Sequence, residues 1–272
     1  MSYALINAAR IHFRIIGDKG PFVAAMSGGR EPLVKIEEFA IEIASLGFTV
    51  ILHDRRNCGK SSLDFINPNP EEDFWENDLC GLLDHLGVGS AFIVGRSRTA
   101  RVAISFSLRH PERTLALGLW GIGGGATTVR FLDHYYFGQY SQAVLAGGMD
   151  EICKTGHFQQ LISQNPENEQ ILLGINPELF LSTISRWRRH FMEKAFEPVM
   201  GLPDDTLRQI QTRTGIVPKY DRLHPVVLAQ RAHSLIENST LFDFRPDHHA
   251  REDNHDDQLA VARILGEFFR AQ

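Results

Sequence analysis

The most informative segment of the chain reads Ala91-Phe92-Ile93-Val94-Gly95-Arg96-Ser97-Arg98-Thr99. Its first half is an apolar run typical of a buried strand, and residues 100–106 continue with the apolar spacing of a helix. The segment therefore predicts a sharp strand-to-helix turn with Ser97 at its apex. Such a turn pushes a serine hydroxyl clear of the sheet, where backbone N–H groups at the helix start can hold a negatively charged oxygen. Ser97 is a candidate nucleophile, with an ordinary helix N-cap as the alternative role.

Strand and helix patterns alternate around this turn. The sequence predicts a hairpin over 3–8 and 11–16, buried strands over 22–26, 48–52 and 114–120, and helices over 33–46 and 74–86. Because strands that alternate with helices run parallel to one another, this order indicates a mostly parallel sheet covered on both faces.

The alternation stops at Gly121-Ile122-Gly123-Gly124-Gly125, and a helical pattern follows from residue 127 to about residue 205. It then resumes with strands over 214–217 and 240–244 and helices over 226–236 and 258–269. We therefore predict an α/β fold whose mostly parallel, eight-stranded sheet is flanked by helices. Residues 1–121 and 206–272 would form the core domain, and residues 122–205 an inserted helical cap.

Composition excludes several classes of partner. The formal net charge of −5 leaves no broad electropositive field for phosphate backbones, which argues against nucleic acid. Cys58, Cys80 and Cys153 follow no metal-ligand spacing and indicate a reducing compartment. No apolar leader begins the chain, and no apolar stretch is long enough to cross a membrane. We expect a cytoplasmic protein without a membrane partner, and the sequence leaves open whether it forms a homo-oligomer.

A serine nucleophile needs an imidazole as base and a carboxylate that orients the imidazole. In open parallel sheets, functional groups gather at the carboxyl ends of the strands. Asp221 follows the strand expected at 214–217, and His248 and His249 follow the strand expected at 240–244. We therefore predict Asp221 as the acid and His249 as the base, with His248 as the alternative base.

At this point the chain resembles the α/β-hydrolase superfamily over nearly its whole length. The segment Asp54-Arg55-Arg56-Asn57-Cys58-Gly59-Lys60-Ser61 is similar to that family's D-x-R-G-x-G-x-S loop, with Asn57 in place of the first glycine. The segment Leu108-Arg109-His110-Pro111-Glu112-Arg113 is similar to the family's connection from the nucleophile helix to the next strand. Ser97 and Asp221 match the family's nucleophile and acid.

The resemblance implies how the site would work. Ser97 would attack a carbonyl carbon, and His249, oriented by Asp221, would act as general base and then general acid. Ser27-Gly28-Gly29-Arg30 stands where the family places its oxyanion-hole loop, so the N–H groups of Gly29 and Arg98 would stabilise the oxyanion. No cofactor and no metal are implied.

Two further groups of residues are candidates for substrate binding. Phe131, Tyr135 and Tyr136 begin the expected cap and would wall the pocket, with ordinary helix packing as the alternative. Arg96 and Arg98 flank the nucleophile, where a guanidinium can bind an anionic substrate through two hydrogen bonds. The alternative is that these arginines pair with acidic residues.

The expected partner is a small-molecule substrate, and the expected reaction is hydrolysis of an ester, lactone, amide or carbon–carbon bond. Because a fold does not fix its chemistry, a cofactor-free lyase and an inactive ligand-binding homologue are the alternatives. A metal site built from Asp247, His248, His249 and His255 is a weaker alternative, since these residues lack ordered ligand spacing.

Overall fold

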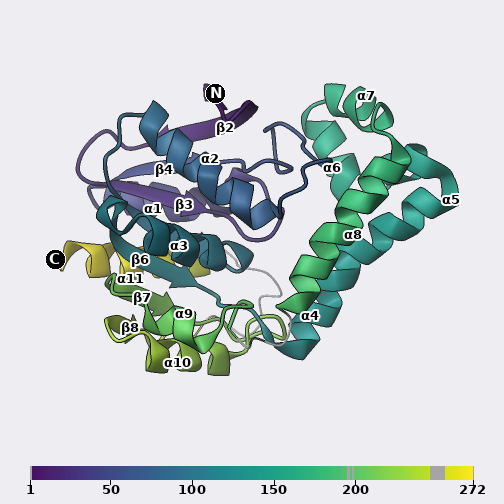
Figure 1. Ribbon diagram of the computed structural model, residues 1–272. Helices are drawn as coiled ribbons and strands as arrows, with labels where there is room; N and C mark the ends of the chain where they lie inside the picture. Colours follow the sequence, from purple (N-terminus) through teal and green to yellow (C-terminus); the bar gives the residue numbers. More distant parts are fainter. Residues whose placement is uncertain (1, 195–196, 198, 246–254, 272) are drawn as a thin grey trace.

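The computed structural model describes residues 2–194, 197, 199–245 and 255–271. Within these ranges the strands form one eight-stranded sheet with the order β1-β2-β4-β3-β5-β6-β7-β8 (Figure 1). The strands are β1 (Ser2–Ile6), β2 (Ala9–Ile16), β3 (Phe22–Met26), β4 (Thr49–His53), β5 (Ala91–Arg96), β6 (Thr114–Trp120), β7 (Thr214–Val217) and β8 (Ser239–Leu241).

The direction of the strands follows from their connections. β1 and β2 form the expected hairpin, and β2 also pairs antiparallel with β4. Every later pair, from β4·β3 to β7·β8, is parallel. All five residues of β4 are buried, as expected for a strand covered on both faces. The predicted fold class, a mostly parallel α/β sheet, is confirmed.

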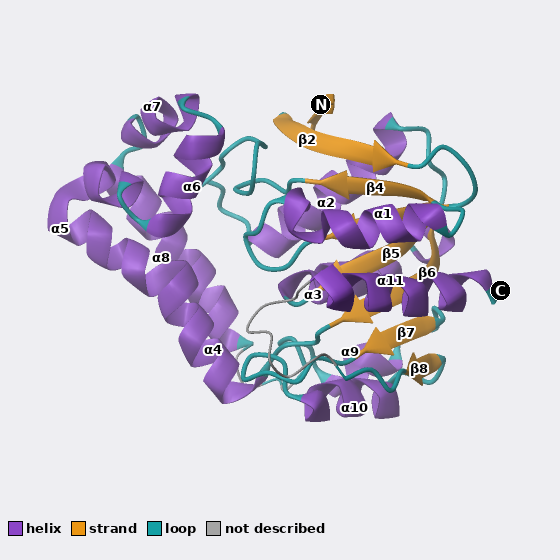
Figure 2. Cartoon of the chain, turned by 180° about the vertical axis from the view of Figure 1, so that it is seen from behind, coloured by secondary structure: helices purple, strands orange, loops and turns teal. Residues whose placement is uncertain are grey.

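Helices cover the two faces of the sheet. α2 (Glu71–His85), α3 (Arg98–Arg109) and α10 (Val226–Leu235) pack on one face, where alternate strand residues such as Ala24 and Met26 meet them. α1 (Glu37–Ser45) and α11 (His255–Arg270) pack together on the other face, against Val23 and Ala25 (Figure 2). This alternation of strand side chains gives the molecule two hydrophobic cores.

A run of helices separates β6 from β7. It comprises α4 (Gly125–Asp133), a π-helical turn (His134–Gly138), α5 (Gln139–Cys153), α6 (Gly156–Gln164), α7 (Glu167–Leu173), α8 (Pro177–Glu193) and α9 (Asp204–Arg208). Figures 1 and 2 show α4 to α8 as an arm beside the sheet, next to the loops that follow the parallel strands. Helices were expected here, and the domain limits 1–121, 122–205 and 206–272 stay predictions.

Several elements differ from expectation in their bounds, and two of them differ most clearly in form. The helix expected over 33–46 begins as a 3₁₀ turn (Leu33–Ile36), and α1 starts at Glu37 because Ile36 leaves helical geometry. The N–H of Leu33 donates to the Asp54 carboxylate. The strand expected over 240–244 is the shorter β8, an edge strand that has only β7 as a partner among the described residues. The same residues include no helix that is both long and apolar enough to serve as a membrane span.

Candidate active site

The turn between β5 and α3 has the geometry of a nucleophile elbow. Ser97 adopts φ 55° and ψ −121°, a strained conformation for a residue with a side chain. Its N–H donates to the carbonyl of Trp120 at 2.9 Å, which fixes the turn to β6. A Cβ at Gly95 would lie 2.3 Å from the carbonyl oxygen of Thr99, so only glycine fits two residues before the serine. Ser97 therefore projects from the carboxyl end of the sheet.

Thr99 occupies the position where this kind of turn usually has a second glycine. Its side chain is fully buried, and the hydroxyl accepts a hydrogen bond from the N–H of Arg96 at 3.0 Å. The same hydroxyl lies 3.0 Å from the carbonyl oxygen of Ser27, to which it can donate. The elbow therefore buries a threonine without leaving its hydroxyl unsatisfied.

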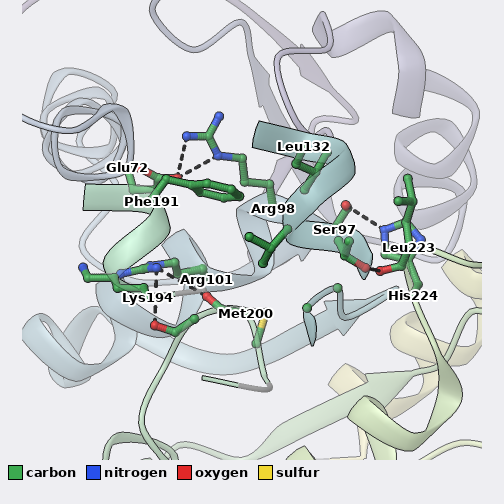
Figure 3. Close-up of a pocket in the computed structure, with 15 residues that line it drawn as sticks. Glu72, Ser97, Arg98, Arg101, Leu132, Phe191, Lys194, Met200, Leu223 and His224 are labelled. Atoms are coloured by element: carbon green, nitrogen blue, oxygen red, sulfur yellow. Dashed lines mark hydrogen bonds and ion pairs between the residues drawn. The ribbon is translucent and has the colours of Figure 1, made fainter. Parts of the chain in front are cut away.

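His224 contacts both Ser97 and Asp221, and Figure 3 shows its ring next to Ser97. Its Nε2 lies 2.8 Å from Ser97 Oγ, and its Nδ1 lies 2.9 Å from both carboxylate oxygens of Asp221. Burial favours the neutral carboxyl, but hydrogen bonds from His224 and the nearby Lys219 outweigh it and hold the pKa of Asp221 well below its usual range. An ionised Asp221 can orient the ring and stabilise its protonated form.

The loop before α10 makes this contact by folding back on itself. Asp221 Oδ1 accepts the backbone N–H groups of Leu223 at 2.8 Å and His224 at 2.9 Å, and this turn places the imidazole over the carboxylate. His249 and His248, the bases expected from the sequence, lie outside the described residues, so His249 stays a prediction. His224 was not among the predicted residues, although its position three residues after Asp221 was a usable signal.

The expected oxyanion loop lies against the elbow. A Cβ at Gly28 would be 3.3 Å from Ser97 Cβ, so the loop passes close to the nucleophile. Arg55, which is fully buried, donates to the carbonyl oxygens of Ser27 at 2.5 Å and Gly29 at 2.7 Å. These bonds occupy the carbonyls of the loop and hold its backbone in place. Gly29 and Arg98 N–H, the latter at the start of α3, stay the predicted oxyanion donors.

The two arginines that flank Ser97 are paired with carboxylates. Arg96 Nη1 lies 2.6 Å from Glu31 Oε2. Arg98 Nε donates to Glu72 at 2.7 Å, and its Nη1 lies 3.2 Å from Glu71 Oε2. Although burial alone would raise it, the pKa of Glu72 falls to about 2 because of the nearby guanidinium groups, Arg98 first. Both arginines therefore pair with acidic residues, which was the alternative expected from the sequence.

A pocket opens beside Ser97 and His224 and contains about 640 Å³ of space, part of it open to solvent. Its lining includes Arg98 but not the other predicted substrate-binding residues, which are Arg96, Phe131, Tyr135 and Tyr136. Phe131 and Tyr135 are about half exposed and stack on each other with ring centroids 6.0 Å apart. Tyr136 is buried, and a Cβ at Gly29 would lie 2.2 Å from its hydroxyl oxygen. The described residues include no cluster that could hold a metal ion.

No family model matches the chain. A 2-hydroxy-6-oxononadienedioate/2-hydroxy-6-oxononatrienedioate hydrolase from Burkholderia vietnamiensis is 31% identical over 119 residues, which are 43% of this chain and 41% of that protein. Epoxide hydrolase 2 from Siraitia grosvenorii is 32% identical over 41% of this chain and 35% of its own length. The chain thus matches less than half the length of these curated relatives.

Solved structures match along the whole chain. A meta-cleavage product hydrolase from Pseudomonas fluorescens superimposes with a TM-score of 0.68 and 19% identity, over 100% of this chain and 98% of that one. An enol-lactonase from Burkholderia xenovorans gives a TM-score of 0.66 and 16% identity, over 100% of both chains. At these identities the structures show the fold, and the partial sequence matches agree with it. The sheet, the strand-to-helix turn at Ser97 and these likenesses together show that the chain has the α/β-hydrolase fold.

Proposed function

We propose that the chain is a serine-dependent hydrolase of a small carbonyl substrate. The observation that carries the proposal is the continuous contact from Ser97 Oγ through the His224 ring to the Asp221 carboxylate. The pocket beside Ser97, and the hydrolases among the curated relatives, support it. Three free cysteines suit the cytoplasm, which we propose as its compartment.

The reaction follows from the positions of these groups. Ser97 Oγ forms a bond to the substrate carbonyl carbon while its proton passes to His224 Nε2. The N–H groups of Gly29 and Arg98 stabilise the resulting oxyanion. When the bond to the leaving group breaks, that group takes the proton from His224. Water then attacks the acyl-enzyme with His224 as base, and Ser97 regains its proton as the acid product leaves.

His224 is the base in this proposal because it is the histidine that contacts both Ser97 and Asp221 among the described residues. The sequence prediction of His249 competes with it. The two histidines differ in their relation to Asp221: His224 shares its turn, whereas His249 follows a later strand. Separate substitutions can therefore assign the base.

The test combines a fluorophosphonate probe, which labels an activated serine, with hydrolysis of p-nitrophenyl esters of short acids. The unmodified chain should be labelled, and Ser97→Ala should abolish both labelling and turnover. His224→Ala should lower turnover by several orders of magnitude, and the double variant with Ser97→Ala should lose little more, because the two residues act as one unit.

His249→Ala provides the matched comparison. Full activity in His249→Ala with loss in His224→Ala would establish His224 as the base, and the reverse result would establish His249. If neither the probe nor any ester in the panel reacted with the unmodified chain, the serine-hydrolase proposal would be wrong.

A further inference from the structure

Two cationic side chains line the same pocket as Ser97 but take no part in the proposed serine chemistry. Arg101 lies on α3, about one helical turn after Ser97, and Lys194 directly follows α8. In the view of Figure 3 both lie on the opposite side of the pocket from Ser97 and His224. Apolar side chains contribute much of the remaining lining: Val129, Leu132, Phe191, Met200 and Leu223.

Neither cation has a carboxylate partner within the described parts of the chain. The contacts of the Arg101 guanidinium are long ones, at 3.4 Å to the carbonyl oxygen of Met200 and 3.5 Å to that of Gly201. Lys194 Nζ lies 2.9 Å from His190 Nε2, a contact that uses one of the three ammonium donors. Glu72, the one acid in the described pocket lining, is bound by Arg98.

The energetics of these groups favour an anion beside them. Burial lowers the pKa of the Arg101 guanidinium, and the attraction of Glu72 offsets only part of that effect. Burial and the neighbouring Arg101 both lower the pKa of the Lys194 ammonium. A lowered pKa means that the charged form loses free energy in this environment. An anion placed between the two groups would recover part of that loss through charge-assisted hydrogen bonds.

We propose that Arg101 and Lys194 form an anion subsite that holds a carboxylate of the substrate. The substrate class is then a carbonyl compound whose acyl part joins the reacting carbonyl to a carboxylate through an apolar stretch. The guanidinium supplies two donors in the plane of the carboxylate, and the ammonium supplies a further charge. This inference rests on the proposed function, because it places the carboxylate relative to the carbonyl that Ser97 attacks.

The test uses two esters that differ in one charge. Mono-p-nitrophenyl glutarate carries a free carboxylate, and its methyl ester is the neutral counterpart. The unmodified chain should hydrolyse the anionic ester with a kcat/KM about 10- to 100-fold above that of the neutral one, the range expected for hydrogen bonds to a charged group. Arg101→Met should remove most of this preference and leave kcat/KM for the neutral ester within about threefold.

Arg109→Met is the matched control, because Arg109 lies on the same helix but outside the pocket lining. It should keep the preference for the anionic ester. Lys194→Met changes the residue directly after α8 and is a second variant of the subsite. The test therefore does not depend on whether Arg101→Met folds well. Equal kcat/KM values for the two esters, or equal losses on both in Arg101→Met and Lys194→Met, would overturn the subsite while the serine mechanism stood.

A binding measurement separates failure of the subsite from failure of the proposed function. Monomethyl glutarate should raise the unfolding temperature of the Ser97→Ala variant, and dimethyl glutarate should not. Adding Arg101→Met to this variant should abolish the increase. If this stabilisation were found but the unmodified chain hydrolysed neither p-nitrophenyl ester, the anion subsite would be supported and the hydrolase proposal would be overturned. Activity on the neutral ester without any stabilisation by monomethyl glutarate would overturn the subsite alone.

Discussion

At position 99 a threonine hydroxyl takes part in the nucleophile elbow, and its partners satisfy the polar atom that this buried side chain brings. The hydroxyl bonds to the N–H of Arg96 and to carbonyl groups of Met26 and Ser27 at the end of β3. The sequence predicts the turn and its serine from local pattern alone. It could not predict these partners, because β3 lies about seventy residues earlier in the chain.

Replacement of this threonine by the more usual glycine should destabilise the protein. Thr99→Gly removes the donor to buried carbonyl groups and places glycine in the first turn of α3, which together should lower the free energy of unfolding by about 1–3 kcal/mol. Thr99→Ser keeps the hydroxyl and should lose less than about 1 kcal/mol. Urea unfolding of both variants checks this expectation, and a Thr99→Gly variant as stable as the unmodified chain would contradict it.

Asp221 and His224 also show how far local sequence can predict the contacts of a single residue. The sequence places Asp221 just after a late parallel strand, where functional groups gather, and in the structure its carboxylate contacts His224. The position of the His224 ring depends on a turn in which Asp221 accepts two backbone N–H groups, and on the approach of that turn to Ser97 from another strand. The spacing of Asp221 and His224 allows the turn, but only the assembled sheet brings that turn close to Ser97.

At the scale of elements, apolar periodicity predicted most strands and helices, because a buried strand and an amphipathic helix each leave a regular pattern. The pattern fails at some of the bounds. α1 begins only after Ile36, which leaves helical geometry, and β8 ends early although the N–H of Phe242 still donates to Ile216. The arginines of the elbow are a further case, since their acidic partners lie on α2 and in the loop after β3.

The packing of α2 against α3 buries the carboxyl group of Glu76, and the titration of this group should make the stability of the protein depend on pH. Burial raises the pKa of Glu76 to about 7, and the half-exposed Arg109, 3.2 Å away, offsets little of this effect. The folded chain therefore holds a proton that the unfolded chain releases at lower pH. The contribution of Glu76 to stability falls as pH rises from about 4.5, the usual pKa, to about 7 and is constant above that.

Glu76→Gln removes this titration. At pH 8 the variant should be more stable than the unmodified chain by on the order of 2 kcal/mol, and at pH 5 the difference should nearly vanish. Glu112→Gln, at an exposed position after α3, is the control and should change stability little at either pH. Urea unfolding at the two pH values gives the measurement, and a Glu76→Gln variant that is destabilised at pH 8 would show that the ion pair with Arg109 outweighs burial.

At the scale of the whole molecule, a buried ion pair joins the sheet to the helices between β6 and β7, α4 to α9, which are called the helical insertion below. Arg30, in the loop after β3, binds Glu71 at the start of α2 through three hydrogen bonds of 2.9 to 3.1 Å. The same guanidinium donates to the carbonyl of Tyr136 at 3.1 Å and lies near the rings of Phe137 and Tyr140. Core and helical insertion therefore share one charged group, which no local pattern in the sequence could indicate.

Replacing one member of this ion pair should destabilise the protein more than replacing both. Arg30→Met leaves the Glu71 carboxylate buried with weaker partners, so we expect a loss of about 3–5 kcal/mol in the free energy of unfolding. Arg30→Met combined with Glu71→Gln also removes the buried carboxylate charge that has lost its main partner, and should recover part of that loss. Arg188→Met is the control: its partner Asp133 also lies in the helical insertion, but Arg188 is about half exposed, and the loss should stay below about 1 kcal/mol.

Hydrogen exchange locates the effect of these variants. In Arg30→Met the amides of residues 136–144 should exchange faster relative to those of β4 and β5, because the contact that ties them to the core is gone. Arg188→Met should leave the exchange of residues 136–144 unchanged. Equal acceleration of exchange in the insertion and in the central strands of Arg30→Met would mean that the pair stabilises the fold as a whole, without a particular role in holding the helical insertion to the sheet.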